Sequence, residues 1–309
     1  MKNTTMIFNS NTVKGRAWPR IRALLLLGII CITLTSCTLF GEGQKAPSSP
    51  SLPSPSSEPA PTTVRITFPE GMTAREIAQR LEENNVCTAQ AFMDEIAMRS
   101  FDYPFIQSIP DDERIYLSLE GFLFPDTYEF YFNETPASVI KRFLANFQKR
   151  MSDMLPEQMA NPGAELFENI TLASIIQKEA GDPVEMKLVS SVFWNRLLSP
   201  DFPMLQSDVT IFYVNQNITP FVTEEKNTAY AEAYNTYKCK NLPAGPICNP
   251  GLEAIKAAFY PEQTDYYYFL TDHAGKYYYT DSFAVHQENW EIAKAVNAKL
   301  QDEASSDAQ

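Results

Sequence analysis

The sequence predicts an α+β fold, in which helices and antiparallel strands occupy separate stretches of the chain. One strand pattern at 64–68 precedes a series of helical patterns, and two aromatic strand patterns come together only after residue 264. The hydrophobic content of 44%, with 20 Phe and 15 Tyr, is enough for one large core or two smaller ones. We therefore expect a small N-terminal module at 64–110 and a larger mixed domain at 111–298.

The small module should begin with a strand and continue with two helices. Residues 64–68 alternate apolar and polar side chains, as a half-buried strand does. Thr73 and Glu76 have the spacing of a capping box, in which both side chains accept hydrogen bonds from backbone N–H groups at the start of a helix. A second helix is expected to begin at Thr88.

The larger domain should open with a strand and a long helix. The segment 121–130 is rich in aromatic residues and is interrupted by Pro125, which indicates a strand and a turn. Pro136 favours the first turn of a helix that runs to about residue 150, because the N–H that proline lacks has no helical partner there.

Two more helices are expected near the middle of the chain. The apolar run 172–180 predicts a helix with Asn169 or Thr171 as its N-cap, and Gly181 should end it. Asp182, followed at once by a proline, is a typical start for the next helix.

A β-hairpin is expected near the C-terminus. The aromatic segments 265–270 and 276–280 predict its two strands, and 272–275 forms the turn between them. The last residues, 299–309, are expected to form a polar tail.

Residues 1–37 have the layout of an export signal or a membrane anchor. Five Lys and Arg side chains precede an uncharged run from 23 to 40, and no acidic residue occurs before Glu42. This run lies at the lower edge of the roughly 17–25 residues that a spanning helix needs. Its Leu-Thr-Ser-Cys segment resembles the bacterial lipobox, in which the cysteine becomes a lipid-bearing N-terminus. We predict lipidation at Cys37, with an uncleaved helix as the alternative, and an extracytoplasmic domain held at the cell membrane.

Residues 38–63 should form a tether between this anchor and the folded domain. Positions 41–63 hold six Pro and six Ser and almost no apolar side chains, so they cannot bury enough surface to offset the entropy lost on ordering. The net charge is −13, and because the first forty residues are basic, the rest is more acidic still. Such a domain repels nucleic acid, so no nucleic-acid partner is expected.

Three cysteines lie beyond the N-terminal region, namely Cys87, Cys239 and Cys248. Outside a membrane, a disulfide between Cys239 and Cys248 would close a short loop that contains Pro and Gly. Two small buried thiols are the alternative, and the unpaired Cys87 favours it.

Glu179 is the candidate for chemistry. It continues the apolar stripe of Leu172, Ile175 and Ile176 at the C-terminal end of the expected helix. Burial and the partial negative charge of a helix C-terminus both disfavour an ionised carboxylate, so the pKa of Glu179 should be raised. A solvated Glu at the edge of the stripe, or one paired with Arg196, fits the same spacing.

Seven segments match motifs of one known family. They are Phe-Pro-Glu-Gly at 68–71, Glu-Gly-Phe-Leu-Phe-Pro-Asp-Thr-Tyr at 120–128, Leu-Ala-Ser-Ile-Ile-Gln-Lys-Glu-Ala at 172–180, 191–197, 205–210, Tyr-Asn-Thr-Tyr at 234–237, and 242–251. In this order they resemble the endolytic murein transglycosylase family, also called YceG-like. The resemblance implies a LysM-like subdomain at 64–110 and a YceG-like catalytic subdomain at 111–298, in a membrane-held enzyme that cuts nascent peptidoglycan glycan strands.

The resemblance also implies a catalytic role for Glu179, which matches the second acidic residue of the family's Glu-Lys-Glu segment. The chain departs from the family at four positions: Gln177 replaces the first acidic residue, Val209 stands where Pro is usual, Tyr277 stands where His is frequent, and Val285 precedes His286. Six further residues are candidates for binding sugar hydroxyl or N-acetyl groups, with an ordinary cap or loop contact as the alternative for each. They are Asn195, Gln206, Ser207, Asp208, Asn235 and Tyr237.

In this class of enzyme, a protonated Glu179 would donate its proton to the oxygen between N-acetylmuramic acid and N-acetylglucosamine. The carboxylate would then accept the proton of the sugar's own 6-hydroxyl as a 1,6-anhydro ring closes. A hydrolytic muramidase would need a second carboxylate, and Glu120, Asp182 and Asp208 are candidates for it. A non-catalytic lipoprotein that binds peptidoglycan and works beside peptidoglycan synthases is a further alternative.

Other classes of enzyme find little support, and neither a metal nor a cofactor is expected. The chain has two histidines, His273 and His286, without the spacing of a zinc site. It has no Gly-x-Ser-x-Gly segment, which disfavours an α/β-hydrolase. The pyridoxal phosphate chemistry of an aminodeoxychorismate lyase would need a cytoplasmic substrate, against which the export signal argues.

Overall fold

The computed structural model describes residues 62–98 and 100–307. The expected export signal, its lipidation site Cys37 and the tether up to residue 61 lie outside the described residues. No helix within the described ranges combines the length and the apolar character needed to cross a membrane.

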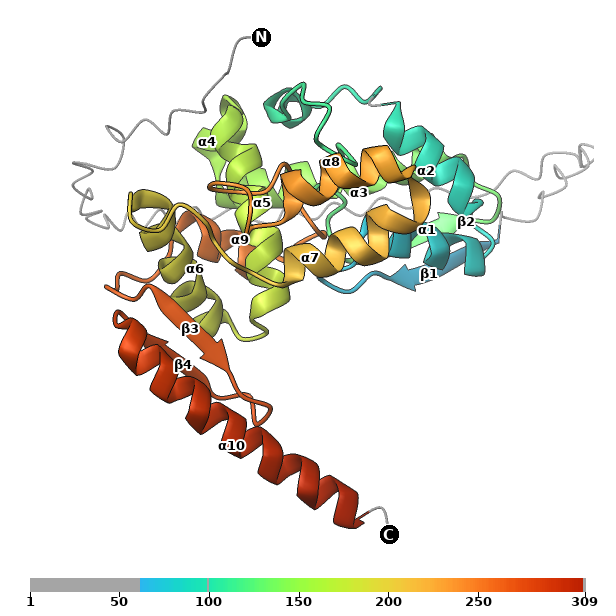
Figure 1. The fold of residues 1–309 in the computed structure, drawn as a ribbon. Coiled ribbons are helices and arrows are strands. Elements are labelled where there is room, and N and C mark those ends of the chain that lie inside the picture. The colour runs from blue at the N-terminus through green and yellow to red at the C-terminus, as the bar shows by residue number, and fades with distance from the viewer. Residues whose placement is uncertain (1–61, 99, 308–309) are drawn as a thin grey trace, which may run out of the picture. The chain divides into compact units, whose positions relative to one another are not determined.

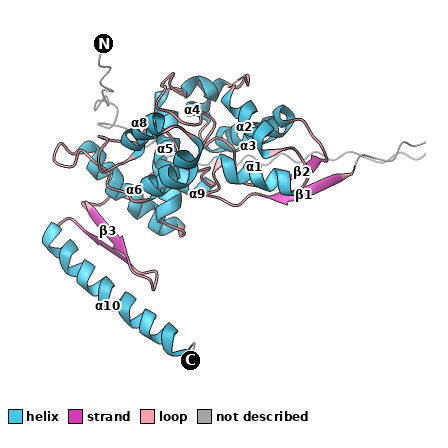
Figure 2. Ribbon diagram, turned by 45° about the vertical axis from the view of Figure 1, so that its right-hand side comes forward, coloured by secondary structure: helices cyan, strands magenta, loops and turns pink. Residues whose placement is uncertain are grey.

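The described chain combines many helices with two small antiparallel sheets, which agrees with the α+β prediction, although helices α1 and α2 lie between the two strands of the first sheet (Figures 1 and 2). The strands are β1 (Thr63–Thr67), β2 (Thr127–Tyr131), β3 (Tyr268–Thr271) and β4 (Tyr277–Thr280). The longer helices are α1 (Ala74–Glu83), α2 (Ala89–Ala97), α3 (Pro136–Met154), α5 (Ala164–Glu179), α6 (Pro183–Leu198), α8 (Glu224–Tyr234), α9 (Leu252–Phe259) and α10 (Phe283–Asp307). The shorter ones are η1 (Pro104–Ser108), α4 (Pro156–Ala160), α7 (Val209–Tyr213), η2 (Val214–Ile218) and η3 (Thr219–Phe221).

The N-terminal part has the order β1, α1, α2, β2. Strand β1 pairs with β2 in antiparallel register, with Thr63 opposite Tyr131 and Thr67 opposite Thr127. Both helices start where the sequence predicted, since Thr73 forms the capping box and Thr88 accepts a hydrogen bond as the N-cap of α2. The second strand, however, lies beyond residue 110, inside the segment that we assigned to the larger domain. Pairing between strands sixty residues apart leaves no local signal in the sequence.

Asn249 joins this N-terminal part to the helices that follow. Its side-chain oxygen accepts hydrogen bonds from the backbone N–H groups of Gly121 and Leu123, both at 2.9 Å. Its side-chain nitrogen donates to the carbonyl of Met72 at 3.0 Å. Its backbone also exchanges hydrogen bonds of 2.8 Å with Met72 and Gly71. The turn before α1, the 121–123 segment and the 249 loop are therefore fixed to one another.

Helix α5 runs through the core and packs against α9 and α6. It starts at Ala164, so the prediction that Asn169 or Thr171 caps it is wrong. Both residues lie inside the helix, where their side chains donate to the carbonyls of Glu165 and Phe167, each at 2.9 Å. Asn and Thr can bond the preceding helical turn as well as cap a helix, and sequence alone did not distinguish the two.

The end of α5 agrees with the prediction. The helix stops at Glu179, two residues before Gly181. Asp182 then caps α6, because its side chain accepts hydrogen bonds from the N–H groups of Val184 and Glu185. The short connection between α5 and α6 therefore fixes the position of the C-terminal end of α5 relative to the start of α6.

The predicted C-terminal hairpin is confirmed as β3 and β4. The side chain of Asp272 closes its turn by accepting hydrogen bonds from the N–H groups of Ala274 and Lys276, both at 3.0 Å. Helix α10 lies alongside the hairpin (Figure 1). Residues 299–307, which we expected to belong to a polar tail, continue this helix.

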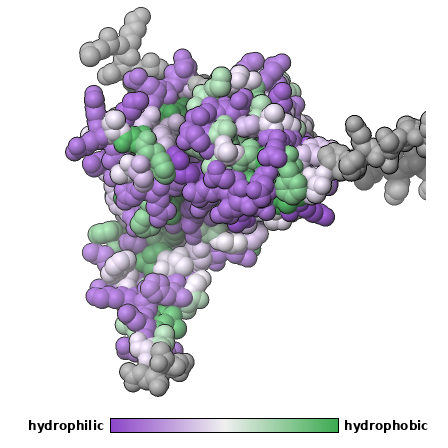
Figure 3. Space-filling view, turned by 90° about the vertical axis from the view of Figure 1, so that its right-hand side faces the viewer, coloured by the Kyte–Doolittle hydropathy of each residue, from purple (hydrophilic) through white to green (hydrophobic). Residues whose placement is uncertain are grey.

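Hydrophilic side chains cover most of the face shown in Figure 3, and hydrophobic ones are scattered among them in small patches. Apolar residues distributed in this way are normal for a surface in contact with water.

Candidate functional site

Glu179 is the last residue of α5, a helix that packs against α6, and a residue of the hairpin strand β4 bonds its backbone. Its side chain is half-buried, and Oε1 accepts a hydrogen bond of 2.5 Å from the hydroxyl of Ser207. Its backbone carbonyl accepts a second hydrogen bond, of 2.9 Å, from the hydroxyl of Tyr277. Both the carboxyl group and the main chain of Glu179 are therefore held by hydroxyl donors.

The pKa of Glu179 is raised above that of an ordinary glutamate, chiefly because burial disfavours the charged form. The hydrogen bond from Ser207 acts in the opposite direction, and the negative charge of nearby Asp208 raises the pKa further. This agrees with the expectation from the apolar stripe. Such a carboxyl can carry a proton at a pH where an exposed glutamate has lost it.

The backbone of the loop that carries Ser207 is fixed by Thr236, which is fully buried. Gln206 adopts a left-handed conformation with φ of 58° and donates its N–H to the carbonyl of Thr236 at 3.0 Å. The N–H of Ser207 donates to the hydroxyl of Thr236 at 2.9 Å, and that hydroxyl donates to the carbonyl of Ser207 at 3.0 Å. The Ser207 side chain is thus presented to Glu179 from a rigid loop.

Asp208 and Tyr237 form the open side of the site. The hydroxyl of Tyr237 donates to Asp208 at 2.8 Å, and the Tyr237 side chain remains 42% exposed. Burial of its hydroxyl end and the charge of Asp208 raise the pKa of Tyr237 to about 12, so it stays protonated near neutral pH. An exposed ring with a fixed polar tip suits contact with a sugar.

Two of the six candidate sugar-binding residues have structural roles instead. Asn195 donates from its side chain to the carbonyls of Thr264 and Tyr266, at 2.8 and 2.9 Å, and so ties α6 to the segment before the hairpin. The side chain of Asn235 accepts from the N–H of Tyr237 at 2.9 Å, which shapes the turn after α8. Asn235 therefore orients Tyr237 through the backbone.

Gln206, a third candidate, is exposed, and its side-chain oxygen accepts a hydrogen bond from Arg196. The buried guanidinium of Arg196 donates to the side chain of Gln206 and to the carbonyls of Met204 and Tyr267, at 3.2 and 3.0 Å. These acceptors are neutral. No ion pair joins Arg196 to Glu179 within the described ranges, and the structure brings Ser207, Asp208 and Tyr237 together around the carboxyl instead.

Glu120, one candidate for a second carboxylate, is only 1% exposed. It accepts hydrogen bonds from the N–H of Ala74 at 2.9 Å, the side chain of Asn249 at 2.9 Å and the hydroxyl of Tyr213 at 3.2 Å. Burial raises its pKa to about 8. A carboxyl enclosed in this way cannot reach a glycan, so its role is structural.

Asp182 and Asp208 are the other two candidates for the second carboxylate, and they differ in whether they can act with Glu179. Asp182 uses its side chain to cap α6. Asp208 is exposed and close enough for its charge to act on Glu179. Asp208 is therefore the carboxylate among the three that could assist Glu179.

The disulfide considered between Cys239 and Cys248 is not formed, since both are free thiols. Cys248 is buried and its thiol donates to the carbonyl of Ser174 at 3.3 Å. Cys239 is half-buried in the turn that follows α8. Among residues 62–98 and 100–307, no three His, Cys, Asp or Glu side chains gather in a way that could hold a metal ion.

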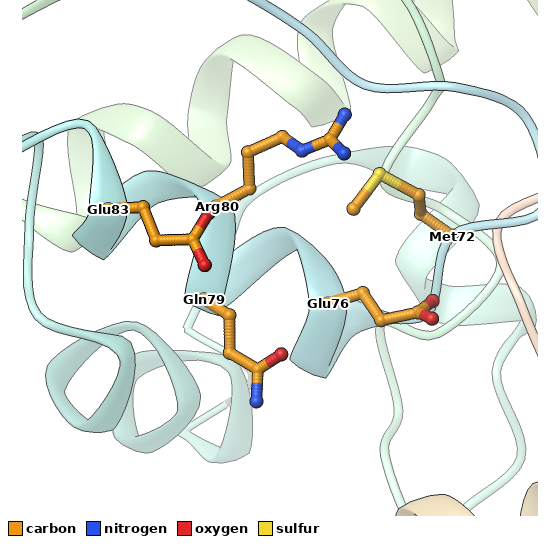
Figure 4. Close-up of a pocket in the computed structure, with 5 residues that line it drawn as sticks. All are labelled: Met72, Glu76, Gln79, Arg80 and Glu83. Atoms are coloured by element: carbon orange, nitrogen blue, oxygen red, sulfur yellow. The ribbon is translucent and has the colours of Figure 1, made fainter.

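A polar pocket of about 250 Å³ lies on α1, and Figure 4 shows the side chains around it. Its lining residues are Met72, Glu76, Gln79, Arg80 and Glu83. None of these belongs to the Glu179 site, and Glu76 and Arg80 are already engaged, in the capping box and with the carbonyl of Thr67.

Sequence reasoning missed Thr236 and Tyr277 as parts of the site. Thr236 lies inside the Tyr-Asn-Thr-Tyr motif, where the sequence analysis names only its neighbours Asn235 and Tyr237 as candidates for binding sugar groups. At Tyr277 the sequence indicates only a departure from the family. Both act on backbone groups of distant segments, which no local pattern reveals.

Comparison with known sequences places this site in a family context. Residues 52–292 match the sequence profile of the YceG-like family. An endolytic murein transglycosylase of Streptococcus pneumoniae (strain ATCC BAA-255 / R6) is 33% identical over 258 residues, which are 78% of this chain and 46% of that protein. An endolytic murein transglycosylase of Bacillus subtilis (strain 168) is 28% identical over 231 residues, which are 72% of this chain and 63% of that protein.

The chain therefore spans about half the length of the first relative and less than two thirds of the second. The fold is similar to the crystal structure of a yceG-like protein from Listeria monocytogenes, with a TM-score of 0.61 and 30% sequence identity. That similarity covers 74% of this chain and 75% of the other.

Proposed function

Because this chain belongs to the YceG-like family, we propose that it is an endolytic lytic transglycosylase of peptidoglycan. It would cleave between N-acetylmuramic acid and N-acetylglucosamine and leave 1,6-anhydro-N-acetylmuramic acid ends. The observation that carries the proposal is Glu179, a half-buried carboxyl with a raised pKa, beside two exposed polar side chains. The names of the two relatives support the same class of reaction.

Glu179 would act first as an acid and then as a base. Ser207 donates to Oε1, and no described residue hydrogen-bonds Oε2, which leaves that oxygen to carry the proton. The proton passes to the glycosidic oxygen as the bond from that oxygen to C1 of N-acetylmuramic acid breaks. The resulting carboxylate then accepts the proton of the sugar's 6-hydroxyl, whose oxygen bonds to C1 and closes the ring.

Asp208 supports a second candidate, hydrolysis by a muramidase route. Its charge acts on Glu179, and an exposed carboxylate near the acid is what an inverting or retaining glycosidase needs. In the transglycosylase, Asp208 and Tyr237 would instead bind the sugar, with Asp208 accepting from a hydroxyl group and the Tyr237 ring lying against a sugar face.

Digestion of purified sacculi by the full chain tests the proposal. Mass spectrometry of the products should find anhydro ends, and Glu179→Gln should lower the rate by roughly 10²- to 10⁴-fold, as expected for loss of a general acid and base. Glu168→Gln is a matched control, because Glu168 also lies on α5 with a raised pKa, about three helical turns before Glu179.

Each of the other outcomes would contradict the proposal. Reducing ends would identify a muramidase. Intact glycan that still sediments with the protein would identify a peptidoglycan-binding protein, in which the β1–α1–α2–β2 part serves as a LysM-like binding module. Full cleavage by Glu179→Gln would remove Glu179 from the mechanism.

A further inference from the structure

The C-terminal hairpin reaches Glu179 through a single tyrosine hydroxyl. We propose that Tyr277 is a positioning residue for Glu179, whose backbone it holds from β4. The inference rests on the proposed function, since Glu179 is the carboxyl that would transfer the proton. It starts from the 2.9 Å hydrogen bond between the Tyr277 hydroxyl and the carbonyl oxygen of Glu179.

The carbonyl of Glu179 needs such a donor because of the way α5 ends. The last carbonyls of a helix have no N–H partner within the helix. Ala180 already leaves the helix with extended backbone angles, φ −140° and ψ 139°. Had the helix continued, the partner of the Glu179 carbonyl would be the N–H of residue 183, which is a proline and has none. Tyr277 supplies the missing donor.

Tyr277 is itself held in place by its neighbours in the hairpin. Its ring stacks beside that of Tyr279, with 6.0 Å between ring centroids and an interplanar angle of 9°. The hydroxyl of Tyr279 donates to Glu185 on α6 at 2.5 Å. Across the strand pair, Phe269 packs edge to face on Phe193 of α6 at 5.7 Å. This face of the hairpin is therefore fixed to α6, and Tyr277 does not swing freely.

The segment before β3 supports the other partner of the Glu179 carboxyl. The carbonyl of Tyr267 accepts a hydrogen bond from Arg196, and Arg196 also binds the side chain of Gln206. Gln206 precedes Ser207, whose hydroxyl donates to Glu179. The hairpin region therefore supports both partners of the Ser207–Glu179 hydrogen bond. Tyr277 bonds Glu179 directly, and Tyr267 is linked to the Ser207 loop through Arg196 and Gln206.

Loss of the Tyr277 hydroxyl would have two effects. The end of α5 would be freer to move, so the carboxyl would spend less time in the orientation that Ser207 fixes. The unpaired carbonyl would also place more negative potential near the carboxyl, which raises the pKa of Glu179. Burial raises the pKa of Tyr277 itself, so the hydroxyl keeps its proton near neutral pH and remains a donor.

Tyr277→Phe tests the proposal in the full chain, and Tyr278→Phe is its matched control. The hydroxyl of Tyr278, the next residue of the same strand, donates to Asp272 at 3.0 Å and not to α5. We expect Tyr277→Phe to lower kcat for glycan cleavage about 3- to 10-fold with KM within about twofold, since a neutral hydrogen bond contributes on the order of 1 kcal/mol. Tyr277→His keeps a ring and a hydrogen-bond donor, so its kcat should lie between those of Tyr277→Phe and the wild type.

A carbon-13 NMR titration of the Glu179 carboxyl gives a readout that does not depend on cleavage. The pKa of Glu179 should rise in Tyr277→Phe and stay unchanged in Tyr278→Phe. Equal kcat values and equal titrations in the two variants would overturn the proposal, and so would a Tyr277→Phe protein without a cooperative unfolding transition. If the wild-type protein cleaves no glycan, the proposed function fails, while the titration still decides whether Tyr277 acts on Glu179.

Discussion

Glu120 and Glu179 both have pKa values raised chiefly by burial, yet they differ in what they can do. Glu120 is enclosed by three hydrogen-bond donors from distant segments, whereas Glu179 is half-buried and next to the exposed pair Asp208 and Tyr237. A raised pKa therefore marks a candidate acid only where the group can also meet a substrate.

Ser207→Ala should change the pH dependence of cleavage. The Ser207 hydrogen bond lowers the pKa of Glu179, so its removal should raise that pKa. Because the protonated form acts first, activity falls as pH rises through this pKa, and the basic limb of kcat/KM should move to higher pH. The maximal rate should fall roughly 10- to 150-fold, since a hydrogen bond to a charged group contributes about 1.5–3 kcal/mol.

A pH–rate profile checks this expectation, with Ser199→Ala as the control. Ser199 lies at the end of α6, where its hydroxyl accepts from the N–H of Asp201. A basic limb that stays in place or moves to lower pH in Ser207→Ala would contradict the role assigned to Ser207.

At the scale of elements, the sequence correctly predicts the helix caps and turns that depend on residues close together in the chain. The capping box at Thr73, the cap at Asp182 and the hairpin turn at 272–275 all follow from side chains that bond backbone a few residues away. The start of α5 and the partner of β1 could not be found in this way. An Asn or Thr can bond inside a helix as well as at its start, and strand pairing depends on distant residues.

In the candidate site, too, the sequence predicts what local patterns determine and misses what depends on distant contacts. Glu179 could be found, because the apolar stripe of its own helix and a family motif both include it. The hydrogen bonds that Ser207 and Tyr277 make to Glu179, and the support that Thr236 gives to Ser207, could not be predicted, since these residues come from segments that meet only in the folded chain. Gln206 and Asn195 were chosen for their side-chain chemistry, which the fold uses for internal hydrogen bonds.

Glu120 connects elements, and its replacement by Gln should alter how stability depends on pH. Its carboxyl joins the N-terminus of α1, the 249 loop and α7. Burial raises the folded-state pKa of Glu120 to about 8, well above that of an ordinary glutamate, so the folded protein holds a proton that the unfolded chain has released. This contribution to stability is complete below the unfolded pKa and is lost as pH rises through about 8.

Urea unfolding of both proteins at pH 5 and pH 8 measures the effect. The wild type should lose roughly 3 kcal/mol of unfolding free energy relative to Glu120→Gln over this interval. The amide still offers an acceptor for Ala74 and Asn249. An exposed Glu165→Gln control should follow the wild type, and a wild type that instead gains stability relative to Glu120→Gln would show that the sign is wrong.

At the scale of the whole molecule, the proposed anchor would confine the folded unit to the surface where new glycan strands emerge. If residues 41–63 form the tether that their composition predicts, some twenty residues would reach on the order of 25 Å as a flexible coil. The acidic charge of the unit disfavours close contact with anionic lipid headgroups, which fits a domain held near a membrane without lying on it.

Metabolic labelling with a fatty acid tests the anchor. The wild-type chain should incorporate the label, Cys37→Ser should lose it, and Cys31→Ser, within the same apolar run, should keep it. A chain that remains membrane-bound but never takes up label would favour the uncleaved helix over the lipid.

The pairing of β1 with β2, and of the β1–α1 turn with Asn249, also determines when the N-terminal part can be completed during synthesis. Ribosomes release a chain from its N-terminus, so β1 has no partner until residues 127–131 have followed it. The backbone bonds of Gly71 and Met72 must wait until residue 249 has emerged. The β1–α1 segment emerges first but completes its hydrogen bonds late. A nascent chain that ends before residue 249 cannot form the bonds between Asn249 and Gly71 or Met72.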